Sequence, residues 1–77
     1  MDDDDAVRLA LDSYHAWLLG KSQLDPRELL LRLPSDSARA EFLKSVRDLN
    51  MLHGFASALS EDRTLDLARQ ARLSLLS

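Results

Sequence analysis

The sequence predicts an all-α fold: a small four-helix domain made of a compact three-helix unit and a more independent C-terminal helix. Apolar residues recur at the three- and four-residue spacing of a helix, without the alternation of a strand. Only two prolines and two glycines interrupt this pattern. The 77 residues allow one domain with one modest core, and the absence of cysteine rules out disulfide bonds within it.

The first helix is expected over residues 3–19. Its apolar positions share one face and are Val7, Leu11, Tyr14 and Leu18. Asp3, Asp4 and Asp5 place negative charge at the end of the helix where the macrodipole is positive. Gly20 suits the left-handed position that follows a helix, so the helix should end just before it.

The second helix, expected over residues 26–33, has an unusually complete start signal. Asp25 can cap it, Pro26 suits the first helical position, and Glu28 completes a capping-box arrangement. Pro34 disfavours helical geometry at the residue before it and therefore sets the end. The helix is consequently short, with about two turns.

This short helix carries three consecutive leucines, Leu29, Leu30 and Leu31. Three neighbouring residues on a helix spread over roughly 200° of its surface, so one packed face cannot bury them all. Either the helix is packed between two other elements, or part of its leucine surface is available to a partner. The sequence leaves both interpretations open.

The third helix, expected over residues 37–59, is the longest, and Ser35 or Asp36 is expected to cap it. Its main apolar stripe consists of Phe42, Val46, Leu49, His53 and Ala56. Gly54 lies inside this pattern and costs about 1 kcal/mol relative to alanine in a helix. It either permits close helix contact or marks a kink.

The fourth helix, expected over residues 61–76, follows a capping Ser60 and has two apolar faces. The first face is narrow and rich in small residues, which suits close packing inside the domain. It consists of Leu67, Ala68, Ala71 and Leu75. The second face mixes leucine with arginine, as protein interfaces often do. It consists of Leu65, Arg69, Arg72, Leu73 and Leu76.

Composition and motifs argue against catalysis, metal binding and nucleic-acid binding. The net charge of −3 disfavours a nucleic acid as the partner. His15 and His53 lack the convergent ligands of a zinc site, and no Gly-rich phosphate loop or nucleophile elbow is present. The sequence therefore predicts no catalytic residue, no metal and no cofactor.

The chain also lacks the features of a membrane or secreted protein. No apolar run approaches the roughly 18 residues that a membrane-spanning helix needs. The start, MDDDD, carries negative charge where a signal peptide carries positive charge. Together with the lack of cysteine, these features predict a cytoplasmic location.

Leucine in excess of what a small core needs is the main functional signal. The residues predicted to contact a partner protein are Leu30, Leu65, Arg69, Arg72, Leu73 and Leu76. The leucines would be the anchors, and the two arginines would pair with acidic partner residues at the rim. The competing interpretation is that the second helix is pinned between the first and third helices and that the fourth helix merely frays, because apolar atoms commonly remain on folded surfaces.

The stretch from Tyr14 to Ala56 resembles the N-terminal domain of bacterial anti-sigma factors. The shared features are a first helix that ends near Gly20, the sequence LDPRE over residues 24–28, and a long third helix. The resemblance implies a fourth, separate helix that helps to clasp a sigma factor. The zinc-binding branch of that family carries His-x3-Cys-x2-Cys, for which the corresponding residues here are Arg32, Asp36 and Arg39. The resemblance is therefore to the zinc-free type.

These observations lead to one functional hypothesis and two alternatives. The hypothesis is a small protein-binding regulatory module that sequesters a transcription factor of the sigma type by steric occlusion. One alternative is a structural homodimer whose excess leucines pair across a two-fold axis. The other is an adaptor that binds a protein other than a sigma factor.

Overall fold

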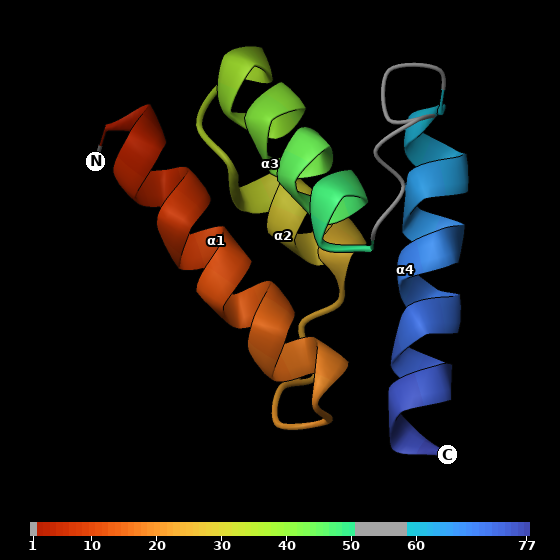
Figure 1. The fold of residues 1–77 in the computed structure, drawn as a ribbon. Helices are drawn as coiled ribbons and strands as arrows, with labels where there is room; N and C mark the ends of the chain where they lie inside the picture. The colour runs from red at the N-terminus through yellow and green to blue at the C-terminus, as the bar shows by residue number, and fades with distance from the viewer. Residues whose placement is uncertain (1, 51–58) are drawn as a thin grey trace.

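The computed structural model describes residues 2–50 and 59–77, and within them the fold is all-α, as the sequence predicts. Four helices follow one another along the chain: α1 over Asp3–Leu18, α2 over Pro26–Arg32, α3 over Asp36–Leu49 and α4 over Glu61–Leu76. In Figure 1, α1, α3 and α4 descend in the same general direction. The short α2 contacts both α1 and α4.

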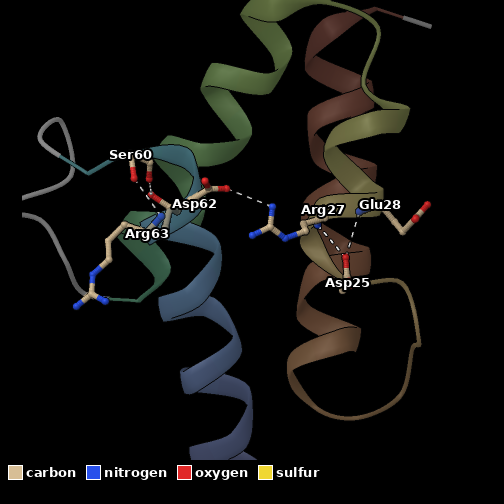
Figure 2. A network of polar contacts seen from close by, with 7 residues as sticks. Asp25, Arg27, Glu28, Ser60, Asp62 and Arg63 are labelled. Atoms are coloured by element: carbon tan, nitrogen blue, oxygen red, sulfur yellow. Dashed lines mark hydrogen bonds and ion pairs between the residues drawn. The ribbon is translucent and has the colours of Figure 1, made fainter.

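Three helices begin at the capping residues that the sequence suggests. The Asp25 carboxylate accepts hydrogen bonds from the backbone N–H groups of Arg27 at 2.9 Å and Glu28 at 3.2 Å (Figure 2). Ser35 and Ser60 cap α3 and α4 in the same way, each through its hydroxyl oxygen at 3.1 Å. Each cap satisfies amide groups that the first helical turn leaves unpaired.

α1 ends in the two-bond arrangement known as a Schellman motif. Gly20 adopts a left-handed φ of 74°, which a residue with a side chain rarely adopts. The amide of Gly20 donates to the carbonyl oxygen of Trp17 at 3.1 Å, and that of Lys21 donates to Ala16 at 2.8 Å. The chain therefore turns sharply at Gly20.

α2 ends one residue before its expected end at residue 33, and α3 ends ten residues before its expected end at residue 59. α2 ends at Arg32, and Leu33 is already extended because Pro34 follows it. α3 ends at Leu49, with Asn50 as its C-cap. The rest of the predicted 37–59 helix, including His53 and Gly54, falls largely on residues 51–58, which lie outside the described residues.

All four helices contribute to one apolar core. Tyr14, Phe42 and Val46 are fully buried at the contact of α1 with α3, the most extensive helix pair. The Tyr14 ring stacks on Trp17 with centroids 5.9 Å apart and meets Phe42 edge to face at 6.1 Å. Leu29, Leu30 and Leu33 add the contribution of α2, and Leu65 and Ala68 add that of α4.

The inward face of α4 differs from the prediction. Leu65 and Ala68 are buried, whereas Leu75, which was expected inside, is 60% exposed. In Figure 1, α1 and α4 both extend further down than the end of α3. The last turns of α4 therefore have α1 beside them but not α3. The buried residues of α4, Thr64, Leu65 and Ala68, all lie in its N-terminal half, and its C-terminal half is more exposed.

Candidate functional site

The structure places two of the predicted partner-contacting residues in the core. Leu30 is 4% exposed and Leu65 is 5% exposed, so their prediction as surface anchors is wrong for this conformation. The reason for Leu30 is that α2 packs against α1 and α4, whereas the sequence suggested that it would be held between the first and third helices. Of the three consecutive leucines, only Leu31 is left outside, with 74% of its surface exposed.

Leu31 lies in a mixed polar and apolar hollow of about 250 Å³. The other lining residues are Arg27, Leu30, Arg39 and Glu61. Both arginines already have partners within the chain. Arg27 forms an ion pair with Asp62 at 3.3 Å, which joins the starts of α2 and α4 (Figure 2). This hollow therefore offers one exposed leucine but little unpaired positive charge.

Arg72 holds α4 against α1 and does not project from a rim, contrary to the prediction. Its Nε donates a hydrogen bond to the carbonyl oxygen of Trp17 at 2.8 Å. Its guanidinium carbon lies 5.1 Å from the centre of the Trp17 ring, a cation–π distance. That carbonyl belongs to the last turn of α1 and also accepts the hydrogen bond from the Gly20 amide, so Arg72 is its second donor.

The start of α4 is held by Arg47 of α3. Arg47 donates from Nε to the Thr64 hydroxyl oxygen at 2.9 Å and from its terminal nitrogen to the Leu59 carbonyl at 2.7 Å. Thr64 is fully buried, and its hydroxyl donates in turn to the Ser60 carbonyl at 2.8 Å. α4 is thus attached at both ends by an arginine side chain.

The remaining predicted residues form an exposed surface, which we name the outer leucine surface and define as Arg69, Leu73 and Leu76. Their spacing of four and three residues places them on one side of α4. Leu73 is 60% exposed, Leu76 is 50% exposed and Arg69 is also exposed. The outer leucine surface is therefore open to solvent in the free chain.

Leu76 also reaches the end of α1. A Cβ atom built on Gly20 would lie 3.2 Å from the Leu76 Cδ2 atom, so the leucine covers the bare glycine. Leu19, the neighbour of Gly20 in the chain, is 56% exposed. Leu19 lies outside the regular apolar stripe of the first helix, so the helical pattern gave no signal for it. Leu76 thus joins the outer leucine surface to the end of α1 at Gly20.

A second open feature lies on another side of α4, and we name it the inner groove. Its volume is about 580 Å³, and it is bounded by the ends of α1 and α3 and by the C-terminal half of α4. Its lining residues are Leu18, Leu49, Asn50, Leu67, Gln70, Ala71, Ser74 and Leu75. Sequence reasoning missed this groove because it assigned Leu67, Ala71 and Leu75 to the buried face.

A third hollow, of about 360 Å³, lies between α1 and α2. Its lining residues are Ala6, Leu9, Ala10, Ser13, Leu24, Leu29, Arg32 and Leu33. The hollow is mostly apolar, with Arg32 as its one charged lining residue. Leu9 is 52% exposed there, which makes this edge of α1 a further apolar surface.

Among the described residues, every buried side-chain nitrogen and oxygen atom has a hydrogen-bond partner. The Tyr14 hydroxyl accepts a hydrogen bond from the Asn50 amide nitrogen at 3.1 Å. Burial raises the pKa of Tyr14 above its ordinary value, and the hydrogen bond with Asn50 offsets part of that rise. Tyr14 therefore remains neutral and acts as a structural group.

Among residues 2–50 and 59–77, no three histidine, cysteine, aspartate or glutamate side chains are grouped as a metal ion would require. None of the helices described there is long and apolar enough to cross a membrane. Comparison of the chain with family models, curated proteins and solved structures finds no match. The exposed surfaces described above are therefore the basis for a proposed function.

Proposed function

We propose that the chain is a small protein-binding regulatory module whose contact site is the outer leucine surface. The observation that carries the proposal is the exposure of Leu73 and Leu76 on one side of α4, next to the exposed Arg69. Clusters of exposed large apolar residues on a small soluble domain often mark interaction sites. Arginine beside leucine is a common composition for such sites.

The partner proposed first is a transcription factor of the sigma type, sequestered by steric occlusion. This choice follows from the resemblance to zinc-free anti-sigma domains carried by Gly20 and residues 24–28. α4 would contribute leucine anchors to the contact, and Arg69 would pair with an acidic residue of the partner. An adaptor that binds a different protein through the same surface is the alternative that the experiment below also addresses.

Substitution of Leu73 tests the contact site. Leu73→Asp places a charge in the centre of the outer leucine surface, and the expected loss is about 2 kcal/mol of binding free energy, roughly 30-fold in Kd. The matched control is Leu31→Asp, because Leu31 is more exposed and lies on α2. Binding is measured by fluorescence anisotropy of the labelled chain against the sigma factors encoded in the same genome, each tested alone.

The two variants separate the possible results. Tight binding of one sigma factor that is weakened by Leu73→Asp and kept by Leu31→Asp supports the whole proposal. If no sigma factor binds, the sigma assignment fails and the adaptor becomes the candidate. Equal weakening by both substitutions would show that the outer leucine surface is not the contact site. Circular dichroism checks that each variant keeps its helical content.

A further inference from the structure

We draw no further inference here: the strongest candidate, the mostly apolar hollow between α1 and α2 that Arg32 helps to line, is an open surface, and nothing in the structure shows what covers it.

Discussion

At the scale of single residues, arginine side chains join the helices by donating to backbone carbonyls. Arg39 donates to Leu30 near the end of α2 at 3.2 Å, and Arg72 donates to Trp17 at the end of α1 at 2.8 Å. Arg47 reaches the carbonyl of Leu59 just before α4. In a small domain these charge-assisted hydrogen bonds between helices add to the stability that the apolar core provides.

The buried Tyr14 predicts how the free energy of unfolding depends on pH in the alkaline range. The phenol ionises near 10 in the unfolded chain, but burial raises its pKa in the folded protein, an effect that the Asn50 hydrogen bond offsets in part. The unfolded state therefore loses the proton first, and stability falls as the pH rises above about 10, whereas below that value Tyr14 adds no pH dependence.

Comparison with Tyr14→Phe isolates this effect, because Tyr14 is the single tyrosine of the chain. The variant should be less stable at neutral pH by about 1 kcal/mol, from the lost hydrogen bond with Asn50. Its deficit relative to the unmodified chain should shrink above pH 10, as measured by urea unfolding at a series of pH values. Parallel profiles for the two proteins throughout the alkaline range would contradict the argument.

At the scale of elements, α4 is attached by two kinds of contact. Its N-terminal half contributes Leu65 and Ala68 to the core, and Arg47 binds the hydroxyl of Thr64. Its C-terminal half contacts α1 chiefly through Arg72 and through Leu76 over Gly20. The second set is small, which is why the last turns of α4 expose leucine on two sides.

Arg72→Ala should therefore weaken the attachment of α4. It removes a charge-assisted hydrogen bond and a cation–π contact, and the expected cost is about 2 kcal/mol of unfolding free energy, or roughly 10 °C in Tm. Trp17 is the only tryptophan, so its emission should change as well. Arg69→Ala on the same helix is the control and should change stability by less than ~0.5 kcal/mol.

Comparison of Arg72→Ala with Arg69→Ala shows which arginine stabilises the fold. Thermal unfolding followed by circular dichroism gives the stability, and tryptophan fluorescence gives the local contact. Equal melting temperatures for the two variants would mean that Arg72 does not hold α4. A lower melting temperature for Arg72→Ala without loss of partner binding would place Arg72 inside the fold and outside the contact site.

At the scale of the whole molecule, the four helices share one core and should unfold together. Trp17 in α1 and Leu65 in α4 belong to the same apolar cluster. The fluorescence of Trp17 and the far-ultraviolet circular dichroism of all helices should therefore give coincident urea transitions. Loss of circular dichroism ahead of fluorescence would show that a helix detaches first. Deuterium exchange of α4 would identify whether that helix is the one.

In the whole molecule, α4 carries two distinct surfaces. The outer leucine surface and the inner groove lie on different sides of the C-terminal half of α4, beyond the end of α3.

Local signals in the sequence determined the fold class and most helix boundaries. Asp25, Ser35 and Ser60 cap helices, Gly20 ends α1, and Pro34 follows the end of α2, all because their effects act within a few residues of chain. The same periodicity placed Tyr14 and Phe42 inside. It also led to the exposed trio of Arg69, Leu73 and Leu76, whose role as a contact site stays a proposal.

Only the tertiary structure decided which leucines and arginines remain available. Leu30, Leu31 and Leu65 look alike in the sequence, yet two are buried and one is exposed, because burial depends on where neighbouring helices lie. Arg69 and Arg72 lie three residues apart in one helix, but only Arg72 donates to the Trp17 carbonyl at the end of α1. The inner groove exists because α1 and α4 both extend past α3, a fact of relative helix position that no local pattern carries.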